Sequence, residues 1–178
     1  MDYYKELQEI AQIDLQDNII GRIEKWKAHR ERILHRAFTA VLTYKNKYIL
    51  QHRKHPVFDS CLDLSFSSHQ LYKNGKLEDD ASAVLSSLNR EWNVKKTSLM
   101  HPPKKIGSVY YEEKDPYSEY SDHEIDYIYL VALNEIPTPN YDFAYGFSLV
   151  EKHDLTKHFS SIFAPWVKKI VNELEERL

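Results

Sequence analysis

The segment DHEIDYIYLVAL, residues 122–133, decides the fold class of the chain. Its residues from Ile125 to Leu133 are rich in Ile, Val and Tyr, which favour a buried β-strand. Because side chains alternate along a strand, Asp122 and Glu124 are expected on the same side of it. Two carboxylates in this arrangement can bind one ion. A solvated acidic strand edge fits the same pattern, and periodicity does not decide between the two.

Regular elements are predicted on both sides of this segment. Residues 37–44 and 48–50 form the two strands of a hairpin, joined by a polar turn at residues 45–47. Between residues 80 and 92 the apolar side chains recur with the one-face spacing of a helix, and a second amphipathic helix occupies residues 167–178. Strands interleaved with two helices indicate a mixed α/β fold.

The N-terminal residues predict a short helix and then a hairpin. Residues 17–18 form a turn, and the apolar pair at residues 19–20 follows it. The helix is predicted from apolar residues with helical spacing ahead of that turn, namely Leu7, Ile10, Ala11 and Ile13.

Length and charge limit the classes of protein to consider. The 178 residues, 42% of them hydrophobic, suit one domain, residues 1–178, with a substantial core. The 24 Lys and Arg residues are balanced by 27 Asp and Glu residues, so no global basic field attracts nucleic acid. No apolar run approaches the roughly 18 residues of a membrane-spanning helix. We therefore expect neither a nucleic-acid partner nor a membrane span.

Cysteine content and the first residues favour a cytoplasmic protein. The single cysteine, Cys61, excludes an internal disulfide. Asp2, Glu6 and Glu9 interrupt the apolar run that a signal peptide needs. The sequence gives no indication of the oligomeric state.

Three of the nine histidines have neighbours that single them out. His29 and His35 lie just before the strand predicted at residues 37–44, and His69 lies in the segment Ser67-Ser68-His69-Gln70. They do not form the closely spaced motif of a structural zinc site. Taken alone, each is more often a surface or core histidine than a metal ligand.

Six segments together resemble consecutive landmarks of the type I isopentenyl-diphosphate isomerases of the Nudix superfamily. The resemblance extends from residue 14 to about residue 172 and implies the Nudix fold, a mixed β-sheet between helices. It also implies a metal-dependent isomerase of isoprenoid biosynthesis that converts isopentenyl diphosphate to dimethylallyl diphosphate. The segments are Asp14–Gly21, Lys25–His29, Leu34–Phe38, Ser68–Leu71, Asp122–Tyr127 and Ala164–Trp166.

The resemblance implies a metal site made of three histidines and two carboxylates. Manganese or zinc is expected there, because imidazole ligands suit these metals better than magnesium alone. Asp122 stands where the family usually has a glutamate, and its carboxylate reaches about one methylene less. By position, the ligands are His29, His35, His69, Asp122 and Glu124.

Further site residues follow from the resemblance one position at a time. Glu91 is expected to bind a magnesium ion together with the substrate diphosphate, unless it is an exposed helix charge. Lys25 and Arg53 are expected to hold the diphosphate, although either can be plain surface. Tyr111 and Trp166 are expected beside the reacting carbon, where an aromatic face stabilises a developing carbocation. A role as core anchor fits Trp166 equally well.

Position 67 departs from the family. The reaction adds a proton on one face of the alkene and removes one from the other, and the family uses a glutamate and a cysteine for the two transfers. Glu124 matches the glutamate, but Ser67 stands at the cysteine position, and a serine hydroxyl ionises far less readily than a thiol. Cys61 is expected to lie too far along the chain to replace it and to be a small buried hydrophobe.

The Nudix box is also degenerate. Aligned on Glu78 and Glu91, the chain has Tyr72 in place of the first glycine and Ser86-Ser87 in place of Arg-Glu. Since Nudix hydrolases gather magnesium ions on the missing glutamates, their loss favours an isomerase. Two alternatives stay open: a hydrolase of another organic diphosphate, and a metal- and diphosphate-binding domain without catalysis.

Overall fold

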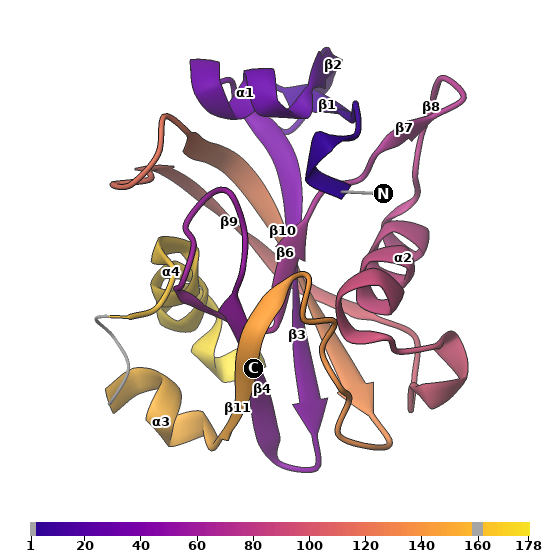
Figure 1. Cartoon of the computed structure of the whole chain (residues 1–178), viewed down its shortest axis with the longest axis vertical. Helices are drawn as coiled ribbons and strands as arrows, with labels where there is room; N and C mark the ends of the chain where they lie inside the picture. The colour runs from indigo at the N-terminus through magenta and orange to yellow at the C-terminus, as the bar shows by residue number, and fades with distance from the viewer. Residues whose placement is uncertain (1–2, 158–161) are drawn as a thin grey trace.

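Two parallel strands, β3 and β10, run through the centre of the computed structural model (Figure 1). β3 is His35–Tyr44 and β10 is Ser121–Leu133, and their register runs from the pair His35–Glu124 to the pair Tyr44–Leu133. β-Branched and aromatic residues suit both strands to burial on two faces. The structure describes residues 3–157 and 162–178.

The other strands complete a mixed and mostly antiparallel sheet. One edge of β3 pairs in turn with β1, β6 and β4, while its other edge pairs with β10, which also pairs with β9. β2 continues the sheet beyond β1, and both β11 and β5 pair with β4. The bounds are β1 Glu9–Ile13, β2 Ile19–Glu24, β4 Lys47–Arg53, β5 Leu62–Asp63, β6 Phe66–Ser68, β9 Lys104–Lys114 and β11 Ala144–Val150, with a separate small hairpin of β7 Tyr72–Lys73 and β8 Lys76–Leu77.

Helices cover both faces of the sheet (Figure 1). Leu42 of β3 packs in the apolar cluster of α2, which includes Leu88 and Trp92. Its neighbour Val41 faces the other way, into the cluster of α4, which includes Ile170. The helices are α1 Lys25–Glu31, α2 Asp80–Trp92, α3 Lys152–Lys157 and α4 Pro165–Leu174, with 3-10 turns at Tyr3–Lys5, Lys96–Ser98 and Glu175–Arg177.

The structure confirms the mixed sheet between helices and most elements predicted from periodicity. The hairpin at residues 37–50 is formed by β3 and β4, and the helix at residues 80–92 is α2. The strand predicted from Ile125 begins earlier, at Ser121. None of the helices in the described part of the chain has the length and apolar character needed to cross a bilayer.

The N-terminal helix prediction is wrong, because residues 9–13 form strand β1. The hairpin itself is confirmed, since β1 pairs with β2. Both faces of β1 are covered, so the neighbours Ile10 and Ala11 are buried together with Ile13, a spacing that imitates one face of a helix.

Leu88 provides a test of the packing that fixes α2. Its side chain is fully buried against the sheet, so Leu88→Ala leaves a cavity and is expected to lower the free energy of unfolding by about 2–5 kcal/mol. The neighbouring Asn89 is exposed, and Asn89→Ala is expected to change it by at most about 0.5 kcal/mol. Urea denaturation of both variants measures the difference. Equal, small effects would contradict this packing.

Candidate functional site

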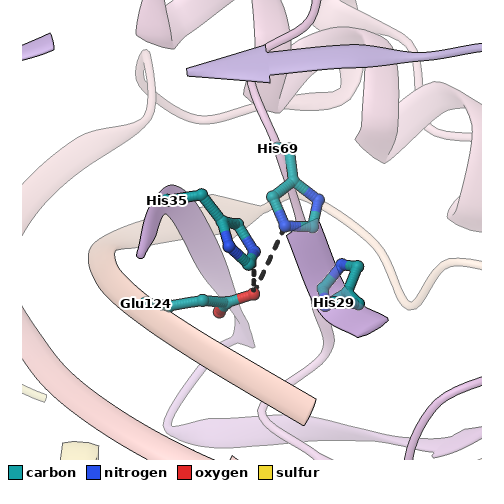
Figure 2. A group of neighbouring side chains, drawn as sticks. All are labelled: His29, His35, His69 and Glu124. Atoms are coloured by element: carbon teal, nitrogen blue, oxygen red, sulfur yellow. Dashed lines mark hydrogen bonds and ion pairs between the residues drawn. The ribbon is translucent and has the colours of Figure 1, made fainter. Parts of the chain in front are cut away.

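Three histidines and one glutamate gather at the start of β3 (Figure 2). His29 comes from α1, His35 begins β3, His69 follows β6, and Glu124 lies in β10. Each offers one nitrogen or oxygen atom, and these atoms all lie within 4.8 Å of one another. All four residues are buried, with at most 8% of their surface exposed. The cluster can therefore hold a divalent metal ion.

The contact of His35 with Glu124 leaves two electron pairs facing one another. His35 Nδ1 lies 2.7 Å from the carbonyl oxygen of Ile33 and donates to it, so in the neutral ring Nε2 carries no proton. That Nε2 atom lies 3.1 Å from Glu124 Oε1, and His69 Nε2 lies 3.3 Å from the same oxygen. Burial lowers the pKa of His69 to about 3, which keeps its ring neutral. A proton on His35 or a metal cation relieves the repulsion between His35 Nε2 and Glu124 Oε1.

His29 gives a second observation that favours a metal ion over a proton. Its Nδ1 lies 3.0 Å from Asp122 Oδ1, so the Nδ1 hydrogen points to Asp122. Its Nε2 atom is buried and has no hydrogen-bond partner among the described residues. Protonating His35 does not satisfy this atom, whereas a metal ion in the cluster does.

Asp122 therefore lies behind His29 rather than among the four clustered groups. A carboxylate in this place fixes the tautomer of a metal-bound imidazole and makes it a stronger ligand. The alternation predicted for the start of β10 is observed, since Asp122 and Glu124 are both buried while His123 between them is partly exposed.

A small pocket adjoins the histidine cluster. Its cavity volume is about 30 Å³, little more than the space of one water molecule. Most residues expected at the site line it, and several unexpected ones do as well. The lining residues are Tyr3, Tyr4, Lys25, His29, Ala37, Arg53, His55, Ser67, Ser68, His69, Arg90, Glu91, Tyr111, Asp122, Glu124 and Trp166.

Lys25 is buried beneath the aromatic residues of the N-terminal turn. Its Nζ atom lies 4.5 Å from the ring centroid of Trp26 and 5.3 Å from that of Tyr3, and it donates to Gln8 at 3.3 Å. Burial, together with the positive charge of Arg90, lowers the pKa of Lys25 to about 7. The ammonium is therefore poised to gain an anionic partner in the pocket.

Two arginines share the pocket with Lys25. Arg53 is buried and paired with Asp63 at 2.8 Å. Arg90 donates from Nη2 to Glu91 at 2.9 Å, while its Nε is buried and has no partner within the described residues. Three cations thus converge on one small pocket, and one of their donors is unused.

Ser67 belongs to a row of short contacts. Its Oγ lies 3.0 Å from Asp63 Oδ2 and 2.8 Å from Thr39 Oγ1, which lies 2.8 Å from Asp126 Oδ2. Three contacts need three protons, and the two hydroxyls supply only two. Asp63 already accepts from a guanidinium and an indole, so the third proton belongs to Asp126. Burial, helped by a neighbouring carboxylate, raises the pKa of Asp126 well above its usual value.

Two aromatic residues of the pocket lie next to the metal cluster. Tyr111 donates its hydroxyl to Glu124 Oε2, and its ring stacks on Trp166 with centroids 5.9 Å apart. Burial, strengthened by the charge of Glu124, raises the pKa of Tyr111 well above its usual value. The two oxygens of Glu124 are thus divided between the histidines and Tyr111.

Two residues considered in the sequence do not reach the pocket. Glu78 accepts from the backbone of Leu71 and pairs with Lys73, so it stabilises a loop. Cys61 does not line the pocket and is only half-buried, at the edge of the apolar cluster of α4.

Sequence reasoning missed Asp63, Arg90 and the tyrosines of the N-terminal turn. Arg90 could have been predicted as a site residue, because it lies next to Glu91 on a helix whose other face is apolar. Asp63 could not, since an aspartate in an apolar stretch has no periodicity that reveals its partners.

The fold and site define a Nudix-fold protein with a buried histidine and carboxylate centre. The MutT protein of Methanosarcina mazei Go1 matches with a TM-score of 0.62 and 12% identity, over 81% of this chain and 94% of that chain. The MutT Nudix hydrolase of Burkholderia pseudomallei matches with a TM-score of 0.58 and 14% identity, over 79% and 98%. At such identities the likeness shows the fold alone.

Sequence relatives identify the family. Isopentenyl-diphosphate Delta-isomerase 1 of Mesocricetus auratus is 33% identical over 90% of this chain and 79% of its own length. The protein of the same name from Bos taurus is 28% identical over the same shares. No protein-family model matches the chain. The chain belongs to the isopentenyl-diphosphate Delta-isomerase family.

Metal content tests the cluster. Protein purified without chelator is expected to contain about one divalent transition metal ion per chain, because three imidazoles and a carboxylate suit manganese or zinc. His69→Ala removes one ligand and is expected to weaken binding by more than the 10–100-fold typical for loss of a supporting partner. His101→Ala is the matched control, since His101 is exposed and outside the cluster. Elemental analysis and competition with a chelator measure both, and equal metal binding in the two variants would contradict the assignment.

Proposed function

We propose that the protein isomerises isopentenyl diphosphate to dimethylallyl diphosphate with the help of a divalent metal. One observation carries the proposal: Glu124 turns one oxygen to His35 and His69 and the other to Tyr111, inside a pocket that Ser67 also lines. Membership of the isomerase family supports it. The resulting reaction is a migration of a carbon–carbon double bond by transfer of protons.

The metal has a defined place in this proposal. His29, His35, His69 and Glu124 would hold it, with Asp122 fixing His29 or joining the ligands through its own carboxylate. The ion, manganese or zinc, supplies positive charge that orients Glu124 and steadies its ionised form. The remaining steps belong to the side chains of this chain.

Proton transfer needs one carrier on each face of the alkene. Tyr111 and Glu124 form the first, because Glu124 Oε2 accepts the Tyr111 hydroxyl and the pair lies in the pocket. Ser67, which also lines the pocket, would be the second carrier. The stacked rings of Tyr111 and Trp166 present aromatic faces that stabilise the intervening carbocation.

The diphosphate is recognised by the three cations of the pocket. Lys25 and Arg53 would take the roles expected from the sequence, and we add Arg90, which lines the same pocket and has a buried Nε without a partner among the described residues. Glu91 lies beside Arg90 and offers a carboxylate for a magnesium ion bound to the diphosphate.

A Nudix hydrolase is the less favoured alternative. Glu78, one of two carboxylates that remain from the Nudix box, is held by Lys73 and the backbone of Leu71 outside the pocket. Glu91 alone makes a weak site for activating water.

Ser67→Cys tests the proposed reaction. The native protein should move the double bond of isopentenyl diphosphate in the presence of manganese and magnesium, as followed by proton NMR. Because a thiol ionises more readily than a hydroxyl, Ser67→Cys is expected to raise the rate of isomerisation. A general acid or base typically contributes about 10²–10⁴-fold to a rate. The double variant Ser67→Cys with Glu124→Gln should be inactive. If neither the native protein nor Ser67→Cys has isomerase activity, the result would favour a hydrolase or a binding domain.

The pH dependence of diphosphate binding tests Lys25. A well-formed contact is expected to contribute about 1.5–3 kcal/mol. Because the pKa of Lys25 is lowered to about 7, its ammonium is present below that pH and lost above it. Calorimetry with inorganic diphosphate should therefore show a larger loss of affinity for Lys25→Ala at about pH 6 than at about pH 8.

Arg53→Ala serves as the control, since a guanidinium stays charged and its loss should weaken binding at both pH values. An unchanged affinity in both variants would show that the two cations do not bind the diphosphate.

A further inference from the structure

Asp63 connects three side chains of the pocket although it does not itself line the pocket. Its carboxylate is fully buried in β5. Oδ1 accepts from Trp166 Nε1 at 2.8 Å, and Oδ2 accepts from Arg53 Nη1 at 2.8 Å and from Ser67 Oγ at 3.0 Å. All three donors line the pocket. The apolar packing of the structure does not explain why an aspartate stands at this position.

The ion pair with Arg53 fixes the charge of Asp63. A buried carboxylate is stable only when it is paired and hydrogen-bonded, and Asp63 has both kinds of partner. The hydroxyl hydrogen of Ser67 therefore points to an anion. Thr39 lies on the second side of Ser67 Oγ, which leaves one lone pair of that oxygen for the pocket.

A serine without such a partner is a poor proton carrier, because its hydroxyl does not ionise near neutral pH. An adjacent acceptor changes this, since the hydroxyl can take up one proton while it gives away its own. The contact between Ser67 and Asp63 has the distance that such an exchange needs.

We propose that Asp63 is a positioning residue that makes Ser67 competent to carry a proton in the place of a cysteine. The inference rests on the proposed function. When the carbocation loses its proton, the substrate C–H bond breaks, its electron pair forms the new double bond, and the proton bonds to Ser67 Oγ. The original hydroxyl proton of Ser67 passes to Asp63 Oδ2, so charge and atoms balance without another reactant.

The hydroxyl proton of Ser67 could also be transferred through Thr39 to Asp126. That path is longer, because the proton would have to pass through two hydrogen bonds, whereas Asp63 accepts directly from Ser67 Oγ.

The test compares Asp63→Asn in two backgrounds, native Ser67 and Ser67→Cys, by measuring kcat and KM with isopentenyl diphosphate, manganese and magnesium. With Ser67, kcat is expected to fall by about 100-fold or more, because the hydroxyl loses its acceptor. With the cysteine, kcat is expected to change by less than about threefold, because a thiolate needs no such acceptor. The loss of the Arg53 partner should raise KM alike in both backgrounds.

A purely structural role for Asp63 gives a different result, namely the same fall of kcat in both backgrounds, and would overturn the inference. Thr39→Val removes the other hydroxyl partner of Ser67 without charge. It should lower kcat far less than Asp63→Asn, and an equal loss would assign the proton to the Thr39 side instead.

Two patterns separate this inference from the proposed function. An inactive native protein with an active Ser67→Cys variant would overturn the role of Asp63 alone. Inactivity of both would overturn the isomerase proposal and the inference with it. If Asp63→Asn does not fold, Asp63→Glu keeps the charge beside Arg53 but displaces the acceptor from Ser67, and the same difference between backgrounds is expected.

Discussion

The parallel pairing of β3 with β10 is the constraint on which the site depends. Its register sets His35 directly opposite Glu124, so a histidine and a carboxylate distant in sequence share one end of the sheet. The other edge of β3 pairs with β6, whose register sets Ser67 opposite Thr39 and brings His69 just beyond the strand. Strand β3 is thereby the common support of the metal cluster and of the serine.

Burial of this many ionisable groups opposes folding, and the two apolar clusters on either face of the sheet offset it. Most of the buried charges are paired, as Arg53 is with Asp63. Three of their polar atoms nevertheless have no hydrogen-bond partner within the described residues, namely His29 Nε2, Arg90 Nε and Asp126 Oδ1. The first belongs to the histidine cluster, where a cation would satisfy it.

Sequence periodicity is sufficient for α2 and for the central strands, because their buried residues recur with one spacing over many positions. It fails for β1, where neighbouring residues are buried on both faces of the strand. The histidine cluster could be named only through the family resemblance, since its members are far apart in the sequence, from His29 to Glu124. The position of Asp122 behind His29, and the contact of Asp63 with Ser67, depend on side-chain geometry that no spacing in the sequence encodes.

Crystals grown with manganese provide the most direct measurement of the central claim, that Glu124 belongs to a metal centre with three histidines. Anomalous diffraction should place one ion about 2.0–2.2 Å from nitrogens of His29, His35 and His69 and from an oxygen of Glu124. A manganese ion bound elsewhere, with His29 Nε2 still lacking a partner, would contradict the claim.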